Sequence, residues 1–319
     1  MKKGPSYDQI QLNLPDLTEF DLTRTVMNNL IEMFCVVDDF SNEFFPEFEQ
    51  HQLELGIKKR NKPCALSPSE IITIMIYFHQ LGFRNFKTYY TQYVQKHLLA
   101  YFPKLLSYNR FVELMPSILM PLCFFIHAQN KEKTGVYFVD ATTIDVCHSK
   151  RANSNRVFKG IAEKSKSTMG WYFGFKLHLV INDCGEIMAF NLTSSTTDDR
   201  VPVEKMTQGL TGKLIGDKGY ISQKLFDTLY QKGLQLITKI KKNMKNKLMP
   251  MLDKLLLRKR AIIESVNDQL KNISQIEHSR HRSVNNFLVN LLSGIAAYTL
   301  QPKKPSLNLR QNSLIGSYS

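Results

Sequence analysis

The feature that most limits the possible folds is a strictly alternating stretch at residues 171–183, WYFGFKLHLVIND. Its apolar residues at odd positions would lie on one side of an extended chain, while Tyr172, Lys176 and His178 would lie on the other. The sequence NDCG at its end is typical of a hairpin turn and predicts an antiparallel partner strand directly after it. We therefore expect a β-sheet with a buried face at the centre of the fold.

Further strand and helix patterns surround this hairpin. The run GVYFVD predicts a short strand that stops at Asp140, and KLIG predicts another that ends just before Asp217. Helical patterns then alternate with KLIG and with a last strand pattern, LQLITKI. Three strands that can form an antiparallel meander are thus followed by an order that favours parallel pairing. The sequence predicts an α/β fold with a mixed five-stranded sheet flanked by helices.

The first 130 residues show helical patterns. Ser67 and Glu70 have the spacing of a capping box at a helix start. Residues 108–130 predict one helix kinked at its prolines, or two helices. We therefore expect an all-α N-terminal domain at 1–130 and an α/β domain at 131–310.

The charge of the chain is divided unevenly. The formal net charge is +14, yet residues 1–130 hold 12 Lys and Arg against 13 Asp and Glu. The excess of positive charge therefore lies in residues 131–319, which favours a polyanion, most often nucleic acid, as partner. A membrane surface is the competing partner. The membrane interpretation is weak because the longest clean apolar run, IITIMIYF, is too short to span a bilayer.

The termini and cysteines point to a reducing compartment. The N-terminus has two lysines without an apolar core behind them, so no signal peptide is predicted. The five cysteines form no C-x-x-C pair. This pattern is typical of reduced cytosolic thiols and does not favour a disulfide framework or a zinc site.

Two aspartates are predicted where strands end, Asp140 after VYFV and Asp217 after LIG. In open α/β sheets, functional residues gather at the carboxyl ends of strands. The glycines of GDKGY would let the backbone turn sharply around Asp217. The simpler explanation for each residue alone is turn formation, since aspartate is common at such positions.

The predicted helix RAIIESVNDQLK carries a third carboxylate. At 100° per residue, Arg260, Glu264 and Lys271 share one narrow stripe opposite an apolar face. The simpler explanation is a solvated face with an i,i+4 Arg–Glu pair. The alternative is that Glu264 joins Asp140 and Asp217, because three carboxylates supply the oxygen ligands that Mg²⁺ prefers.

Together these blocks resemble the DDE-type insertion-sequence transposases. Asp140 in YFVDATTIDV, Asp217 in LIGDKGYIS and Glu264 in RAIIESVNDQLK are similar to that family's catalytic triad. The last block resembles the family signature Y-x2-R-x3-E-x6-K, with Leu257 in place of the tyrosine. The resemblance implies a ribonuclease-H-like catalytic fold in which the three carboxylates hold two Mg²⁺ or Mn²⁺ ions.

The resemblance also implies a function. Such a protein cuts DNA at the ends of an insertion sequence and joins the 3′ ends to target DNA by phosphoryl transfer. Its expected partners are double-stranded DNA, as terminal inverted repeats and as target, and a second copy of the chain, with no membrane. The N-terminal helices would assist end binding and dimerisation in the bacterial cytoplasm, at the nucleoid. Two alternatives stay open: a structure-specific nuclease that cuts without joining, and an inactive DNA-binding relic.

Further residues are assigned around the carboxylates. Basic side chains near the triad and in two basic stretches are expected to contact phosphates, and these are Arg260, Lys271, Lys241, Lys242, Lys245, Arg151 and Lys218. The alternative for the stretches is a merely soluble basic surface. Asp199 is expected to support the site or cap a helix. His178 is expected near it, with a packed, hydrogen-bonded histidine as the simpler explanation.

Overall fold

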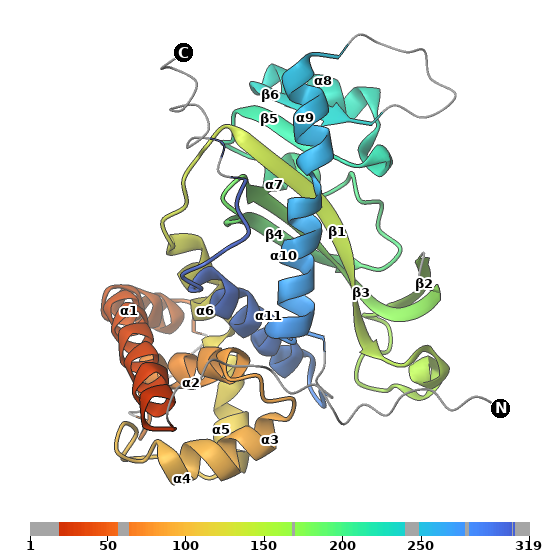
Figure 1. The fold of residues 1–319 in the computed structure, drawn as a ribbon. Helices are drawn as coiled ribbons and strands as arrows, with labels where there is room; N and C mark the ends of the chain where they lie inside the picture. The colour runs from red at the N-terminus through yellow and green to blue at the C-terminus, as the bar shows by residue number, and fades with distance from the viewer. Residues whose placement is uncertain are drawn as a thin grey trace, which may run out of the picture.

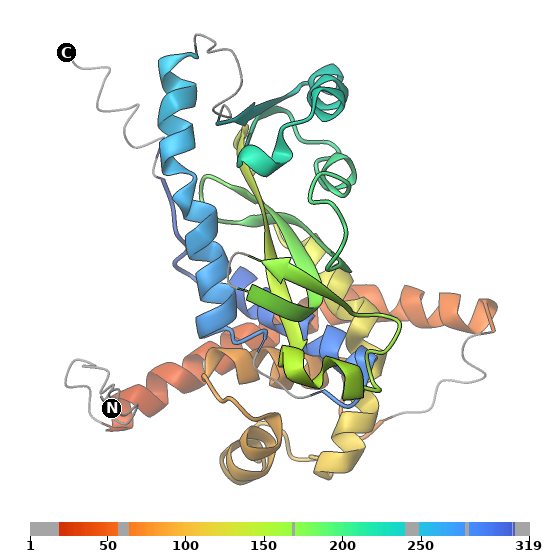
Figure 2. The ribbon, with the colours of Figure 1, turned by 90° about the vertical axis from the view of Figure 1, so that its right-hand side faces the viewer.

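The computed structural model describes residues 19–56, 64–167, 170–239, 249–277, 281–307 and 309. Three of the predicted DNA contacts, Lys241, Lys242 and Lys245, lie outside these described residues. Figures 1 and 2 show the N-terminal helices at one end of the molecule and the sheet with its flanking helices extending away from them.

The N-terminal region contains helices. They are α1 (Glu19–Glu54), α2 (Pro68–Gln80), α3 (Phe86–Thr88), η1 (Tyr89–Val94), α4 (Gln95–His97), α5 (Tyr108–Leu114), η2 (Met115–Ile118) and α6 (Leu119–Ala128). At the start of α2, Ser67 and Glu70 each accept a hydrogen bond from the other's backbone N–H, so the predicted capping box is confirmed. The predicted break in residues 108–130 is also confirmed, because the 3₁₀ segment η2 with Pro116 separates α5 from α6.

The rest of the chain is built on a six-stranded sheet. Its strands are β1 (Val136–Cys147), β2 (Glu163–Ser167), β3 (Gly170–Asn182), β4 (Ile187–Ser194), β5 (Gly212–Gly216) and β6 (Leu234–Thr238). The strand order is β2-β3-β1-β5-β6, and β4 also pairs with β3. Strands β1, β3 and β4 pair antiparallel, whereas β1, β5 and β6 pair parallel. The predicted meander followed by parallel strands is therefore confirmed.

Two strands differ from the sequence-based prediction. Strand β1 does not stop at Asp140, because its residues up to Cys147 continue to pair with β3. Strand β2 was not among the predicted strands, since EKSKS has no apolar alternation, yet its backbone pairs with β3 as an edge strand. The 3₁₀ segment η3 (Ser149–Ser154), which also lies between β1 and β3, was not predicted either. The sheet thus has six strands where five were expected.

Helices cover both faces of the sheet. They are α7 (Val203–Met206), η4 (Lys218–Tyr220), α8 (Gln223–Gln231), α9 (Met251–Lys259), α10 (Ala261–Asp268), η5 (Gln269–Ile273) and α11 (Val284–Thr299). In Figure 1, α9 and α10 form one column in front of β1. Phe138 of β1 shares the main core with Ile263 of α10, whereas Val139 shares a smaller core with Leu229 of α8. Side chains alternate along a strand, so Asp140 faces α10.

Helix α11 lies among the N-terminal helices. It packs against α2 and α6, and the main core runs without a break from these helices to the sheet. Gly294 allows a close approach, because a Cβ there would lie 2.3 Å from the Ile276 side chain. Buried His79 of α2 hydrogen-bonds through Nδ1 to the backbone carbonyl of Ser274. The expected boundary falls in the connection between α6 and β1, and the division into two domains stays a prediction.

One helical run is long and apolar enough to cross a membrane by length and composition, Tyr108–Ala128, which comprises α5, η2 and α6. The core helix of a globular protein passes the same test. Here α6 packs against α11 and contributes Leu122 and Phe125 to the main core. The run is therefore weak evidence for a membrane segment.

Candidate active site

The candidate active site lies where β1 and β5 separate. The two strands pair in parallel only from Val136 to Phe138 on β1, with Phe138 opposite Ile215. Two positions further along, β1 reaches Asp140 and the chain after β5 reaches Asp217. The two aspartates therefore stand at equivalent positions just beyond the last backbone pair, at the kind of strand end where open α/β sheets carry functional residues.

Two glycines shape the turn that presents Asp217. Its carboxylate accepts a 2.7 Å hydrogen bond from the backbone N–H of Gly219. A Cβ at Gly219 would lie 2.9 Å from Asp217 Oδ1, and a Cβ at Gly216 would lie 3.1 Å from the buried ring of Tyr220. Glycine at both positions therefore lets the carboxylate and the tyrosine ring pack closely against the backbone.

The start of α10 brings a carboxylate and a cation to Asp140. Arg260 stands between α9 and α10, and its guanidinium lies 3.8 Å from Asp140 Oδ1 and pairs directly with Glu264. Asn267, on the same helix, donates a 3.1 Å hydrogen bond from Nδ2 to Asp140 Oδ2. The i,i+4 Arg–Glu pair of the simpler explanation is thus present, but its arginine also serves the predicted active-site aspartate.

Burial gives Asp140 an unusual protonation behaviour. Desolvation is the main cause that raises its pKa to about 6; Arg260 lowers the pKa, and the carboxylates of Asp217 and Glu264 raise it. Burial also raises the pKa of Tyr220, followed by the charge of Asp140. Within the described residues the Tyr220 hydroxyl has no hydrogen-bond partner. The site is therefore a partly buried concentration of negative charge with Arg260 as its neutralising cation.

The donor set of the site suits a hard divalent cation. Carboxylate oxygens are the ligands that Mg²⁺ and Mn²⁺ prefer, and a cation would offset the repulsion that Asp217 and Glu264 exert on Asp140. Among the described residues, no group of three His, Cys, Asp or Glu side chains is already arranged to hold a metal ion. Arg260 makes the neutralising contacts here, and a metal held by all three carboxylates would take over that role.

Lys271 contacts other residues than Arg260 and Glu264 do. It lies in η5, a π-helical segment whose wider turn breaks the regular 100° spacing on which the predicted stripe depended. Its Nζ lies 3.3 Å from Glu277 Oε2 and 3.5 Å from Thr143 Oγ1. Glu277 also accepts a 2.8 Å hydrogen bond from the backbone N–H of residue 145, on β1. Lys271 therefore extends the candidate site along β1.

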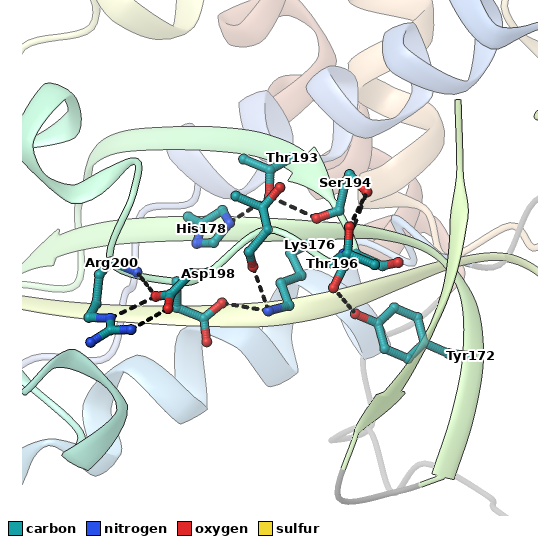
Figure 3. Close-up of polar contacts among 11 residues, drawn as sticks. Tyr172, Lys176, His178, Thr193, Ser194, Thr196, Asp198 and Arg200 are labelled. Atoms are coloured by element: carbon teal, nitrogen blue, oxygen red, sulfur yellow. Dashed lines mark hydrogen bonds and ion pairs between the residues drawn. The ribbon is translucent and has the colours of Figure 1, made fainter. Parts of the chain in front are cut away.

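A second polar cluster surrounds the loop after β4 (Figure 3). Lys176 of β3 forms a 2.9 Å ion pair with Asp199, and His178 hydrogen-bonds to Thr193 Oγ1 at 2.8 Å. Asp199 therefore pairs with a lysine and caps no helix, while its charge is one of those that raise the pKa of Tyr220. Burial lowers the pKa of His178 to about 4, as expected of a packed, neutral histidine. A supporting role for Asp199 and His178 stays a prediction.

Two predicted DNA contacts remain to be placed, and two residues of the candidate active site were not predicted from the sequence. Lys218 directly follows Asp217 and is exposed, and Arg151 is exposed on η3. Asn267 was missed, although it falls on the same helical stripe as Glu264 and was detectable there. Glu277 was also missed, and no sequence spacing signals that a residue beyond the helix folds back onto β1.

The fold and the site together define a class of protein. A mixed sheet flanked by helices, with carboxylates at the separation of two strands and on a helix crossing them, is the arrangement expected of a ribonuclease-H-like DDE domain. Residues 130–284 match the family model described as transposase DDE domain, which supports a DDE-type transposase. A comparison with curated proteins found no match. The family resemblance and the predicted fold class are therefore confirmed, and a transposase domain implies DNA as a partner.

Proposed function

We propose that this chain is the transposase of an insertion sequence. It cuts DNA at the ends of the element and joins the 3′ ends to target DNA, with Asp140, Asp217 and Glu264 as catalytic carboxylates and two Mg²⁺ or Mn²⁺ ions as cofactors. The observation that carries the proposal is the convergence of the carboxylates: two follow the last pair of β1 and β5, and the third shares Arg260 with Asp140. The transposase domain match over residues 130–284 supports the same chemistry.

The protein's own residues position the reacting groups. Asp140, Asp217 and Glu264 would hold the metal, which would supply activation of the attacking oxygen and neutralisation of phosphate charge. The amide of Asn267 fixes the orientation of Asp140, and a backbone N–H fixes that of Asp217. In-line displacement at phosphorus depends on such positioning more than on covalent help from the protein.

The cations around the carboxylates bind the DNA backbone. Arg260 would contact a phosphate beside the cut, because its guanidinium lies 3.8 Å from Asp140. Lys271 meets a phosphate further along β1, near Thr143. Exposed Lys218, next to Asp217, adds a contact at the site, and exposed Arg151 on η3 adds one elsewhere on the basic part of the chain. Lys241, Lys242 and Lys245 complete the set as proposals from the sequence.

A strand-transfer assay with the repeats that flank the gene tests the proposal. In Mg²⁺ the wild-type protein should nick the repeat ends and join them to a second DNA. Asp140→Asn and Asp217→Asn should do neither while binding DNA equally well or better, since each change removes a metal ligand and a negative charge but no phosphate contact. Asp227→Asn is the matched control, because Asp227 is an exposed residue of α8, and this variant should remain active. Nicking by Asp140→Asn at the wild-type rate would overturn the site.

The same assay separates the alternatives. A structure-specific nuclease cuts without joining, and an inactive relic binds without cutting. Cutting should require Mg²⁺ or Mn²⁺, whereas Ca²⁺ should support binding alone, because its larger, looser coordination fixes in-line geometry poorly. Robust cutting in excess chelator would remove the metal ions from the mechanism.

The proposal includes partners and place. The DNA partners are the terminal inverted repeats and the target, and a second copy of the chain joins the complex so that two ends are held together. The basic charge of residues 131–319 supports the DNA partners. The place is the bacterial cytoplasm, at the nucleoid. Light scattering of complexes with one or two repeat ends measures the number of copies, and one copy on paired ends would refute the dimer.

A further inference from the structure

A second basic surface stands apart from the candidate active site. It consists of six exposed cations on η3, on β2 and between them: Lys150, Arg151, Arg156, Lys159, Lys164 and Lys166. Among the described residues, none of the six forms an ion pair with an acidic side chain. Glu163, the acidic residue of this stretch, is occupied by the hydroxyls of Ser194 and Thr196. Lys164 donates a 2.9 Å hydrogen bond to the neutral amide oxygen of Asn153, which leaves its charge uncompensated. Cations without an acidic partner attract a polyanion.

Trp171 adds an aromatic side chain to this surface. It is the chain's only tryptophan and is 65% exposed, although so large a ring is normally mostly buried. Trp171 stands opposite Lys166 in the pairing of β2 with β3, and Lys164 stands opposite Phe173. Directly opposed residues point to the same face of a sheet, so the indole and both ammonium groups share one face. We call the six cations and Trp171 the hairpin surface.

The hairpin surface lies at a defined distance from the candidate active site. Leu179 of β3 is opposite Asp140, and Trp171 stands on the same strand eight positions earlier. At about 3.3 Å per residue, these positions are about 26 Å apart along the strand. Duplex DNA rises about 3.4 Å per base pair, so the separation corresponds to about eight base pairs of a duplex that runs along the strand. Figure 1 shows β2 and the parallel pair β5 and β6 at opposite edges of the sheet.

We propose that the hairpin surface is a second DNA-contact site, which holds the duplex about eight base pairs from the phosphate that is cut at Asp140. Lys164 and Lys166 contact phosphates, and Trp171 packs its indole against the sugars and base edges of the groove between them. The proposal rests on the proposed function, because the distance is counted from a cut at Asp140. The DNA held there is either the element's repeat or the sequence flanking it.

The tryptophan is its own reporter, since no other tryptophan contributes to the emission. Full-length protein is mixed in Ca²⁺ with duplexes that carry the flanking repeat, and binding is followed separately by the anisotropy of labelled DNA. Acrylamide should quench Trp171 strongly in the free protein, because its ring is exposed. Quenching should be largely lost in the complex with a long duplex, because the DNA covers the ring.

Duplexes shortened on one side of the cut locate the contact. Protection of Trp171 should disappear when that side ends nearer than about eight base pairs, while anisotropy still reports binding through the other side. The side whose shortening removes the protection, repeat or flank, is the one that the hairpin surface holds. Protection that is missing with every bound duplex, or that survives shortening on both sides, would overturn the proposal.

Variants give an independent measure. Lys164→Ala combined with Lys166→Ala should lower the slope of log affinity against log salt by about two, since each phosphate contact contributes about 0.9. Lys224→Ala on α8, equally exposed, should leave the slope unchanged. Trp171→Ala should weaken binding about three- to tenfold and Trp171→Phe less, because phenylalanine keeps an aromatic face. Wild-type slopes and affinities in all these variants would also refute the site.

Failure of the proposed function gives a different pattern. A flat anisotropy trace with repeat DNA refutes both the function and the hairpin site. Cutting and joining with Trp171 still fully quenchable refutes the hairpin site alone. Protection of Trp171 by bound DNA without any cutting supports the hairpin site and refutes the catalytic assignment.

Discussion

Arg260 balances the negative charge of the candidate active site. Its side chain is 18% exposed and pairs with Asp140 and Glu264, whereas Glu264 is 57% exposed, so solvent screens that half of the contact. A cation held among carboxylates in this way stabilises the metal-free protein. It would also compete with a metal ion for the same oxygens, which would make the two cations alternatives.

Replacing Arg260 by glutamine should therefore change both stability and metal response. Without metal, Arg260→Gln should lower the free energy of unfolding by about 1–2 kcal/mol, because Asp140 stays buried and loses its counterion. Mg²⁺ or Mn²⁺ should raise the melting temperature of Arg260→Gln more than that of the wild type, since no guanidinium has to be displaced. Thermal melts with and without metal measure both effects.

Arg200→Gln is the matched control, because the ion pair of Arg200 is with Asp198 on the exposed surface and not with one of the three carboxylates. Its melting temperature should stay near the wild-type value and respond to metal as the wild type does. Equal metal-induced shifts in Arg260→Gln and wild type would show that the arginine does not compete for these oxygens.

Glu277 is expected to act on DNA binding through Lys271. Removing a carboxylate near bound phosphates should tighten binding if only charge matters. The contacts predict the opposite, because the Glu277 carboxylate pairs with the Lys271 ammonium and accepts a hydrogen bond from a backbone N–H of β1. Glu277→Ala should weaken DNA binding and lower the salt slope by about 0.9, as Lys271→Ala does. Adding Lys271→Ala to Glu277→Ala should cost little more.

The control for this pair is Glu204→Ala, whose exposed carboxylate pairs with Lys232. It should leave binding unchanged or slightly tighter. Tighter binding by Glu277→Ala would mean that Glu277 only repels DNA, and additive losses in the double variant would separate its effect from Lys271.

At the residue level, the sequence predicted site residues correctly where they stand in short blocks with a regular spacing. Asp140, Asp217 and Glu264 lie within recognisable sequence blocks. The structure places the two aspartates just beyond the residues at which β1 and β5 pair. Glu277 was beyond reach, because its contacts arise from a chain reversal after η5 that depends on packing against α11 and α2.

Among the elements, alternation identified the central strands and failed at the edge. Strand β3 is buried along most of its length and pairs on both sides, so its apolar residues had to follow the pleat. Strand β2 has polar and exposed residues, because an edge strand is held by backbone hydrogen bonds and is protected from aggregation by its lysines. Periodicity carries no signal for such a strand.

The helix after Arg260 shows a second limit of periodicity. An ideal helix places Lys271 beside Glu264, but the π-helical segment η5 shifts the register after Asp268. Such segments depend on tertiary packing and often occur at functional sites. Here the shift brings Lys271 to Thr143 on β1, so the local irregularity decides which strand residue the lysine meets.

His79 should make the junction between α2 and the end of η5 sensitive to acid. Burial lowers its pKa to about 4, so the folded protein resists a proton that the unfolded chain accepts below about pH 6.5. The contribution of neutral His79 to the free energy of unfolding is fully present above pH 6.5. It is lost as pH falls toward 4, by up to about 3 kcal/mol. Urea unfolding at pH 7.5, 6 and 5 should show this loss in the wild type and a smaller loss in His79→Gln.

The control is His51→Gln, whose ring is 68% exposed on α1. Its stability should follow the wild-type curve at each pH. The residual acid sensitivity of His79→Gln comes from His281 and His178, for each of which burial also lowers the pKa to about 4. A wild-type pH dependence in His79→Gln would contradict the assignment to His79.

In the whole molecule, charge separates two faces of the N-terminal region. Residues 25–57, which include most of α1, contain seven Asp and Glu and no Lys or Arg. The region of α3 to α5 instead exposes five cations, which are Arg84, Lys87, Lys96, Lys104 and Arg110. We therefore expect the predicted role of this region in binding DNA ends to be served by the surface of α3 to α5 and not by α1.

Paired charge variants test this orientation. Neutralising two exposed carboxylates of α1, Glu43→Gln with Glu47→Gln, should change affinity for repeat DNA less than about twofold at 0.15 M salt, because charges farther than about 8 Å are screened. Lys87→Gln with Lys96→Gln should weaken binding and lower the salt slope by about one to two, since phosphate contacts are lost. Both pairs are exposed, so folding should survive in each. Salt titrations of DNA binding decide between them. If the α1 pair changes the slope and the lysine pair does not, DNA runs along α1, and the acidic helix must then reach it through bound cations or a partner copy.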